Sequence, residues 1–423
     1  MPGRREAVDK TAKTAYHLWQ LMAQKLQETA ERPKRALLVS IADGRKPVRG
    51  KASDEAGGEA SDEAAGEAPP FDAGRELRGL AETLELEIAG HEIIRIRERS
   101  PKFGMGSGKA GELAEKAKLL EADCLVFDWD PGPSQQRNWE ALAGIPVIDR
   151  QEMIIRIFAQ RAATREADLQ VQLAQLNYRL PRLTHKYIDL SRQRGGRYGT
   201  KGSGETLLET DRRQIEQRIH RLEKEIEQVV RQRQVQRRQR ERQRVPVCAI
   251  VGYTNAGKSS LLNALTGSAV FVEDKLFATL DATTRRFEPT PGMPALLTDT
   301  VGFIRRLPHT LIKAFRSTLE EATHASLLIH VLDIADPEID ECFKTTVSVL
   351  DELGAGAIPV VTVLNKTDRL DPEQRDAVLA GFPESVAVSA RDGTGLRELK
   401  AAIAQKLDEI GGRQKRPDCG TDR

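Results

Sequence analysis

The sequence is poor in cysteine and has no long apolar run. Its 423 residues include four cysteines, none with a Cys-x-x-Cys or other metal-ligand spacing. This scarcity argues against a disulfide framework and fits a reducing compartment. No apolar stretch approaches the roughly 20 residues of a membrane span, and the charged N-terminus lacks the apolar core of a signal peptide. We therefore expect a cytoplasmic protein without stable membrane insertion, and we leave partial association with a membrane surface open.

Net charge is also nearly absent. Lysine and arginine number 65 against 63 aspartates and glutamates, so the formal net charge of +2 identifies no partner. The charge is unevenly distributed, with an Ala/Gly/Glu/Asp tract at 51–70 and a dense arginine run at 231–244. The tract has too little apolar surface to offset the entropy cost of ordering, which predicts a disordered insertion. The arginine run indicates a polyanionic partner such as RNA, with a solvated helix face as the alternative.

A strand, a glycine-rich loop and a helix follow one another after residue 246. The apolar run Val247–Val251 is followed by two glycines with four residues between them, and then by Lys258 and Ser259. This spacing lets backbone N–H groups converge on the phosphates of a nucleotide. We expect Lys258 to reach the β- and γ-phosphates and the Ser259 hydroxyl to bind Mg²⁺. The predicted phosphate loop consists of Gly252, Tyr253, Thr254, Asn255, Ala256, Gly257, Lys258 and Ser259.

Two further segments predict groups that sense the terminal phosphate. A polar switch-like segment contains Phe277, Ala278, Thr279, Leu280 and Asp281, and the end of an apolar strand contains Asp299, Thr300, Val301 and Gly302. Thr279 would complete the Mg²⁺ shell when a γ-phosphate is present, and Asp299 would hold the ion through water. The Gly302 N–H would face the γ-phosphate. Lys258, Thr279 and Gly302 are therefore the predicted catalytic residues.

The last two segments predict recognition of guanine. The strand 359–364 ends in Asn365, Lys366, Thr367 and Asp368, and a later apolar run ends in Ser389, Ala390 and Arg391. The Asp368 carboxylate is placed to accept hydrogen bonds from N1–H and the 2-amino group of guanine, and adenine offers neither donor. The Ala390 N–H would meet the guanine O6. Five motifs in this order predict a domain that binds GTP or GDP with Mg²⁺.

Phe303 stands where Ras-like switch proteins carry the glutamine that orients the attacking water. A phenyl ring neither donates nor accepts a hydrogen bond, so we expect slow intrinsic hydrolysis, with another group or a bound partner positioning the water. Arg285, Arg305 and Arg306 are candidate charge stabilisers, and each is equally explained as a surface or phosphate-contacting residue. Phe303→Gln alone is expected to leave turnover roughly unchanged, whereas Lys258→Ala is expected to abolish it.

The part of the chain before residue 149 alternates between helical and extended patterns. Over residues 33–148 this alternation predicts an α/β domain with a largely parallel sheet, beginning with a strand at Arg35–Ile41. Residues 1–32 form an extension that is either a docking helix or mobile. The glycine-rich segment Phe103–Lys109 has the wrong glycine spacing for a phosphate loop, and Ala110 stands where a hydroxyl would bind Mg²⁺. Contact with an RNA backbone is the better prediction there.

Residues 149–244 carry two stripes of leucine and isoleucine in heptad-like steps. One long helix over 149–183 and another over 208–244 are predicted to form an antiparallel hairpin. Its tip, 191–205, is glycine-rich and basic and contains Tyr198, so contact with nucleic acid and a plain flexible loop are both supported. A GTPase domain with a doubly wound, mostly parallel sheet follows over 245–410. Residues 411–423 are predicted to be a disordered tail.

Four segments of the C-terminal half strongly resemble the HflX GTPases of the translation-factor-related class. They are Gly252–Ser259, Leu276–Arg285, Thr298–His309 and Ala314–Glu321, and the resemblance extends over about residues 71–408. It implies a ribosome-associated GTPase, monomeric when free, that binds the large ribosomal subunit and ribosomal RNA rather than DNA. It further implies a role in splitting or rescuing stalled ribosomes under stress. A large-subunit assembly GTPase and a nucleotide-gated RNA-binding adaptor remain the alternatives.

Overall fold

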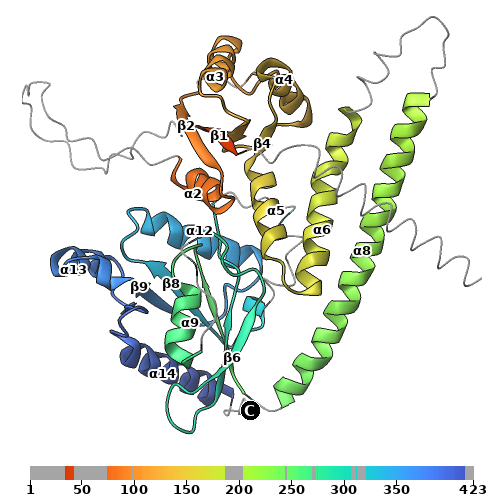
Figure 1. Cartoon of the computed structure of the whole chain (residues 1–423). Helices are drawn as coiled ribbons and strands as arrows, with labels where there is room; N and C mark the ends of the chain where they lie inside the picture. The colour runs from red at the N-terminus through yellow and green to blue at the C-terminus, as the bar shows by residue number, and fades with distance from the viewer. Residues whose placement is uncertain are drawn as a thin grey trace, which may run out of the picture. The chain divides into compact units, whose positions relative to one another are not determined.

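The computed structural model in Figure 1 describes residues 34–41, 74–96, 100–185, 203–242, 245–268, 273, 275–305, 311 and 321–414. The predicted extension at 1–32, the acidic insertion at 51–70 and most of the hairpin tip lie outside the described residues, as do the side chains of most of the arginine run. Contacts divide the chain into two compact units, Met1–Arg150 and Gln151–Arg423. The predicted division into 33–148, 149–244 and 245–410 stays a prediction.

The first unit contains a parallel sheet whose described strands lie in the order β2-β1-β3-β4. These strands are β1 (Arg35–Ile41), β2 (Glu87–Ile94), β3 (Cys124–Phe127) and β4 (Val147–Asp149). Three helices connect them: α2 (Arg75–Thr83), α3 (Ser107–Leu119) and α4 (Pro133–Ala143). In Figure 1, α3 and α4 lie on one side of the sheet and α2 on the other. The predicted α/β class and parallel sheet are confirmed.

The glycine-rich segment Phe103–Lys109 enters the core of this unit. Phe103 and Met105 are buried, and the Trp139 Nε1–H donates a hydrogen bond to the Phe103 carbonyl at 2.9 Å. The Trp139 ring also packs edge-on against Phe103, with ring centroids 5.4 Å apart. The first half of the segment therefore connects β2 to α3 by packing inward. The predicted RNA contact stays a prediction for the exposed second half, where Lys109 forms an ion pair with Glu112.

The second unit begins with a helical region. It consists of α5 (Arg150–Arg161), α6 (Arg165–Arg179), the 3₁₀ helix η1 (Leu180–His185) and α8 (Ser203–Arg242). The prediction of one helix over 149–183 is wrong, because the helix stops after Arg161 and restarts at Arg165. Thr164 has an extended backbone, and its Oγ1 accepts a hydrogen bond from the Ala167 N–H at 3.2 Å. A threonine that caps the next helix in this way competes with continuation of the previous one.

Helices α6 and α8 run antiparallel, as the facing stripes predict. Arg165 lies 3.7 Å from Glu225, and Arg218 donates to Gln172 at 3.0 Å, so the contact moves backward along α8 as it moves forward along α6. Leu169 and Leu222 are buried. No helix in the described part of the chain has the length and apolarity that crossing a membrane requires.

The second sheet has its described strands in the order β10-β9-β8-β5-β7-β6. They are β5 (Val247–Gly252), β6 (Thr283–Phe287), β7 (Ala295–Asp299), β8 (Leu327–Asp333), β9 (Val360–Asn365) and β10 (Val386–Ala387). The edge strand β6 is antiparallel to β7, and all other pairs are parallel. This confirms a mostly parallel sheet, whose strands β5, β7, β8 and β9 end at the same edge.

The helices of this sheet complete the fold. They are α9 (Lys258–Thr266), α12 (Ile339–Glu352), the short η2 (Thr367–Arg369), α13 (Pro372–Gly381) and α14 (Leu396–Gln414). Apolar residues of β5, β7, β8, α9 and α14 form one buried core. Helix α14 extends to Gln414, so the predicted disordered tail is wrong for its first four residues, 411–414. Residues 415–423 lie outside the described part.

His330 in the middle of β8 makes the stability of this unit depend on pH. The side chain is 1% exposed, and burial, together with the charge of Lys258, lowers its pKa from 6.5 to about 4. The unfolded chain therefore takes up a proton in this window that the folded chain refuses, so stability falls as the pH falls from 6.5 towards 4. We expect a loss of about 2 kcal/mol between pH 7 and pH 5, measured by urea unfolding.

The matched variant for this prediction is His330→Leu, which removes the titrating group. Its free energy of unfolding should change less between pH 7 and pH 5 than that of the wild type. Equal changes in the two proteins would assign the acid sensitivity to other groups.

Candidate functional site

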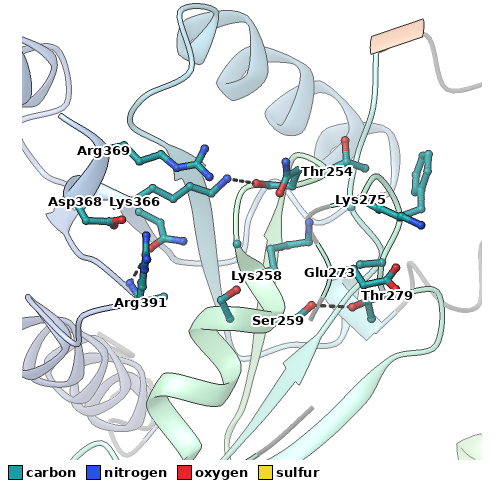
Figure 2. A pocket seen from close by; sticks show the side chains of 18 residues that line it. Thr254, Lys258, Ser259, Glu273, Lys275, Thr279, Lys366, Asp368, Arg369 and Arg391 are labelled. Carbon is teal, nitrogen blue, oxygen red and sulfur yellow. Dashed lines mark hydrogen bonds between the residues drawn. The ribbon is translucent and has the colours of Figure 1, made fainter. Parts of the chain in front are cut away.

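A cavity of about 370 Å³ lies at the edge where the parallel strands end. Its lining comes from five segments that are distant in the sequence. In Figure 2, Asp368 and Arg391 lie toward one end and Ser259 and Thr279 toward the other. The lining residues are Thr254, Asn255, Gly257, Lys258, Ser259, Ser260, Glu273, Lys275, Phe277, Ala278, Thr279, Gly302, Asn365, Lys366, Asp368, Arg369, Ala390 and Arg391.

The loop between β5 and α9 depends on its two glycines. Gly257 has φ +88°, and a Cβ there would stand 2.3 Å from Nδ2 of Asn365. Gly252 has φ +147°, and a Cβ there would stand 2.2 Å from the Val331 carbonyl oxygen. A side chain at either position would push the loop away from β8 or β9. Gly257 also begins α9 without a side-chain cap, which leaves the N–H groups of the first turn available to a phosphate.

Lys258 places a buried ammonium group at the centre of the cavity. Its side chain is 6% exposed, and Nζ donates to the Tyr253 carbonyl at 2.8 Å. Burial lowers the pKa of Lys258 to about 8, against the opposing effect of Asp299 and with a further lowering by Lys366. A Cβ at Gly302 would stand 2.8 Å from this nitrogen. The Lys258 ammonium and the Gly302 backbone therefore meet at one point, as the predicted γ-phosphate site requires.

Three oxygen-bearing side chains meet beside Lys258. The Ser259 hydroxyl donates to Oδ2 of Asp299 at 2.6 Å and lies 2.7 Å from the Thr279 hydroxyl, which is 3.0 Å from the same Oδ2. Figure 2 shows Ser259 and Thr279 pointing toward each other. Asp299 is fully buried, and burial raises its pKa, although the Lys258 charge and the two hydroxyls oppose that rise. Its Oδ1 makes no hydrogen bond within the described residues.

These oxygens fit a small hard cation. Mg²⁺ takes oxygen ligands at about 2.0–2.1 Å in octahedral geometry, which puts neighbouring ligands about 2.9 Å apart. The three oxygens of Ser259, Thr279 and Asp299 are 2.6–3.0 Å apart without an ion. The predicted metal residues Ser259 and Thr279 are thus brought together with Asp299 on one side of the cavity.

The opposite end of the cavity joins the guanine motifs to the phosphate loop. The Asn365 amide donates to the Ala256 carbonyl at 2.9 Å and accepts from the Ala390 N–H at 3.1 Å. Lys366 Nζ donates to the Asn255 carbonyl at 2.7 Å and pairs with Asp333 at 2.8 Å. The Ser389 hydroxyl donates to Oδ1 of Asp368 at 2.8 Å. No other hydrogen bond to the Asp368 carboxylate is present within the described residues, so its second oxygen can accept from a ligand while Ser389 orients the group.

Matches to known protein families cover most of the chain. Family models described as GTP-binding GTPase N-terminal, GTP-binding GTPase Middle Region and 50S ribosome-binding GTPase match residues 72–159, 161–240 and 247–366. The GTPase HflX of Akkermansia muciniphila is 49% identical over 357 residues, which are 80% of this chain and 82% of the relative. The chain belongs to the HflX GTPase family. The GTPase HflX of Escherichia coli is 45% identical, over 80% of this chain and 81% of that relative.

A solved structure also aligns with this HflX GTPase. It is the crystal structure of a GTP-binding protein from the archaeon Sulfolobus solfataricus in complex with GDP, with 23% identity and a TM-score of 0.43. The alignment covers 89% of this chain and 99% of that chain.

Some residues that the sequence motifs assign to the nucleotide do not line the cavity. The Thr300 hydroxyl donates to the Ile250 carbonyl at 2.6 Å, and Leu280 and Val301 are buried. The Asp281 carboxylate turns to the N-terminus of α6. The full set outside the lining is Gly252, Tyr253, Ala256, Leu280, Asp281, Asp299, Thr300, Val301, Thr367 and Ser389. Asp299 and Ser389 still act on lining residues through hydrogen bonds.

Phe303 in this HflX GTPase is a core residue. Its ring is 1% exposed, and its backbone pairs with the phosphate loop, because the Thr254 N–H donates to the Phe303 carbonyl at 2.7 Å and the Phe303 N–H donates to the Gly252 carbonyl at 3.1 Å. Position 303 therefore braces the loop and does not direct a side chain into the cavity. Of the three candidate arginines, Arg305 pairs with Glu338 at 3.1 Å, Arg285 is exposed outside the lining, and Arg306 lies outside the described residues.

Phe303→Gln is expected to destabilise the protein by about 3 kcal/mol, because it removes a packed ring and buries an amide. The turnover of the folded fraction should stay near the wild-type value, since the new amide has no direct route into the cavity. Urea unfolding and single-turnover hydrolysis measure the two effects. Phe303→Leu, which keeps the apolar character, should cost less. A variant with unchanged stability and faster hydrolysis would contradict the buried placement.

Sequence reasoning missed several residues of the site. Lys275, Glu273 and Arg369 line the cavity, and Asp333 holds Lys366 against the phosphate loop. Asp333 could have been predicted as a site residue, because it ends the apolar strand β8 at the edge of the sheet where the other motifs lie. The other three residues lie in polar segments, where the sequence does not show whether a charged side chain points into a cavity or into solvent.

Proposed function

We propose that this HflX GTPase binds the large ribosomal subunit and couples GTP binding and hydrolysis to the splitting or rescue of stalled ribosomes. The family model for residues 247–366, described as 50S ribosome-binding GTPase, supports the partner. The observation that carries the nucleotide part is the meeting of Ser259, Thr279 and Asp299 beside the buried Lys258 ammonium. A site of this kind distinguishes a third phosphate, because Thr279 and the Gly302 N–H would contact only the γ-phosphate and its metal, whereas Lys258 also reaches the β-phosphate.

We further propose a role for each side chain. Asp368, oriented by Ser389, reads the guanine edge, and Lys366 with Asn365 holds the phosphate loop in register with it. The loop N–H groups and Lys258 bind the phosphates, and the Gly302 N–H faces the γ-phosphate. Ser259 and Thr279, with Asp299 acting through water, would hold Mg²⁺, which would neutralise charge on the phosphate oxygens.

The position of Phe303 bears on how hydrolysis is controlled. Because this ring is buried, the group that orients the attacking water comes from another residue or from the ribosome. We propose that hydrolysis is slow in the free protein and accelerates on the ribosome. Slow turnover would keep the GTP-bound form available until the protein reaches its partner.

The proposed RNA contact lies in the helical region. The arginine run at 231–244 provides a dense positive charge in the sequence, and α8, which contains most of the run, precedes β5 in the chain. We propose that this region contacts ribosomal RNA, that the protein is a cytoplasmic monomer when free, and that residues 33–148, 149–244 and 245–410 act as three functional parts. Binding should weaken steeply as salt rises, because phosphate neutralisation releases counterions.

Sedimentation with purified ribosomes tests the proposal. The protein is mixed with ribosomes or with separated subunits in GDP, in a non-hydrolysable GTP analogue and without nucleotide. We expect association with the large subunit that is strongest in the GTP analogue and a shift of intact ribosomes into subunits. Association with free large subunits alone, without splitting, would favour an assembly factor. Equal sedimentation in all nucleotide states, or a flat salt response, would contradict the proposal.

A further inference from the structure

The junction between α5 and α6 contacts the segment that carries Thr279. This junction consists of residues 158–164, and the switch segment consists of the described residues 273 and 275–281. The two lie in the same compact unit, although more than a hundred positions separate them in the sequence. Three separate contacts join them, and none of the proposed roles in nucleotide binding explains these contacts.

The strongest contact is made by Asp281. Its Oδ2 accepts from the backbone N–H groups of Ala163 and Thr164, both at 3.1 Å, and its Oδ1 accepts from the Thr164 hydroxyl. Thr164 is also the residue that caps α6. A carboxylate at this place satisfies orphan donors of the helix start and interacts favourably with the positive end of the helix dipole.

Two further contacts fix the other end of the switch segment. The Phe277 ring packs edge-on against Phe158 of α5, with centroids 4.8 Å apart, and both side chains are buried. Phe277 has φ +55°, a backbone conformation that is strained for a bulky residue and that persists only where packing enforces it. Glu273 also forms an ion pair with Arg161 at the end of α5.

Thr279 lies between these anchors. Phe277 precedes it by two positions and Asp281 follows it by two, so the α5–α6 junction holds the chain on both sides of the hydroxyl that contacts Ser259 and Asp299. We propose that Asp281 and Thr164 are positioning residues that couple the helical region to recognition of the third phosphate. This inference rests on the proposed nucleotide site and adds to it the route by which the helical region acts on that site.

The coupling works in both directions because it is a free energy shared by two events. When the junction holds Thr279 in place, binding of a triphosphate with its metal requires less free energy to order the switch segment. A diphosphate has no third phosphate and depends less on Thr279. A partner that moves α6 would therefore change the preference for GTP over GDP, and GTP would change the affinity of α6 for that partner.

Asp281→Ala tests the coupling. Calorimetry in Mg²⁺ measures the affinities of the full chain for GDP and for a non-hydrolysable GTP analogue. We expect the ratio of GTP-analogue affinity to GDP affinity to fall about tenfold, because the analogue must then order the segment itself. Hydrogen exchange should show that the amides of Ala163 and Thr164 lose protection. The matched control is Glu288→Ala, an exposed carboxylate that pairs only locally with Arg286 within the described contacts and should leave the ratio unchanged.

Two further variants keep the test decisive if Asp281→Ala folds poorly. Arg161→Ala removes the ion pair with Glu273 and should lower the same affinity ratio by a smaller factor. Thr164→Ser keeps the hydroxyl and should behave as the wild type. An unchanged ratio in both Asp281→Ala and Arg161→Ala, with the wild type binding both nucleotides, would overturn the coupling and leave the proposed function intact. A wild type that binds neither nucleotide would overturn both.

Discussion

Lys258→Ala is expected to reduce GTP turnover to below about one thousandth of the wild-type rate. The ammonium group lies between the phosphate loop and Gly302, where charge develops on the transferred phosphate. Removing one positioned donor of this kind typically costs a factor of about 100 to 1000, and here phosphate binding is lost as well. Single-turnover hydrolysis with and without ribosomes measures the effect.

The same variant should be at least as stable as the wild type without nucleotide. Burial already lowers the pKa of Lys258 to about 8, so the empty site holds a charge that the interior disfavours. Urea unfolding of the nucleotide-free protein measures this. Lys344→Ala, which removes an exposed lysine of α12 paired with Glu341, is the matched control and should change neither property. A Lys258→Ala variant that still turns over GTP would contradict the role of Lys258 in hydrolysis, and one that unfolds would assign Lys258 a structural role.

Asp368→Asn is expected to weaken GTP binding about a hundredfold and to improve binding of xanthosine triphosphate. The free carboxylate oxygen of Asp368 can accept from guanine, and the loss of charge removes charge-assisted hydrogen bonds worth about 1.5–3 kcal/mol each. Xanthine carries a carbonyl where guanine has its 2-amino group, so an asparagine N–H can donate to it. Competition binding with the two triphosphates measures the exchange.

The control for this exchange is Asp376→Asn, an exposed carboxylate on α13 that lies outside the cavity lining. It should leave both affinities unchanged. Equal loss of both triphosphates in Asp368→Asn would mean that Asp368 supports the fold of the loop through Ser389 and does not read the base.

Much of the GTPase sheet follows from the sequence. The predicted run Val247–Val251 is one residue shorter than β5, the predicted strand 359–364 lies one position before β9, and β1 of the first unit has the predicted bounds. Their apolar runs are short, continuous and bounded by motifs, so a buried parallel strand is the natural interpretation. The bounds of the helices were harder to predict, because one helix ends before Thr164 and the next begins after it although the apolar periodicity continues on both sides. A local cap overrides periodicity there, and a scan for leucine spacing cannot detect it.

Some residues of the candidate site also lie where the sequence predicts, and others make contacts that only the structure shows. Lys258, Ser259, Thr279, Asp299 and Asp368 fall where their motifs placed them, because each motif depends on backbone geometry that a few adjacent residues set. Asp281 follows Thr279 by two positions and belongs to the same motif, yet its carboxylate binds the start of α6. The sequence predicts from the chemistry of the ring that Phe303 does not position water. The structure adds its burial and its pairing with the phosphate loop.

The sequence alone determined the nucleotide class, the order of the strands along the chain and the groups that meet the phosphates, because these depend on residue types at short, fixed spacings. Only the tertiary structure decided that Asp281 holds α6, that Asp333 braces Lys366 and that Phe303 is buried. Thr164 and Asp281, for example, are 117 positions apart. Contacts between residues so far apart in the sequence depend on how whole helices and strands pack together. In a polar segment, the direction of a side chain is decided by the neighbouring helix or strand that it contacts.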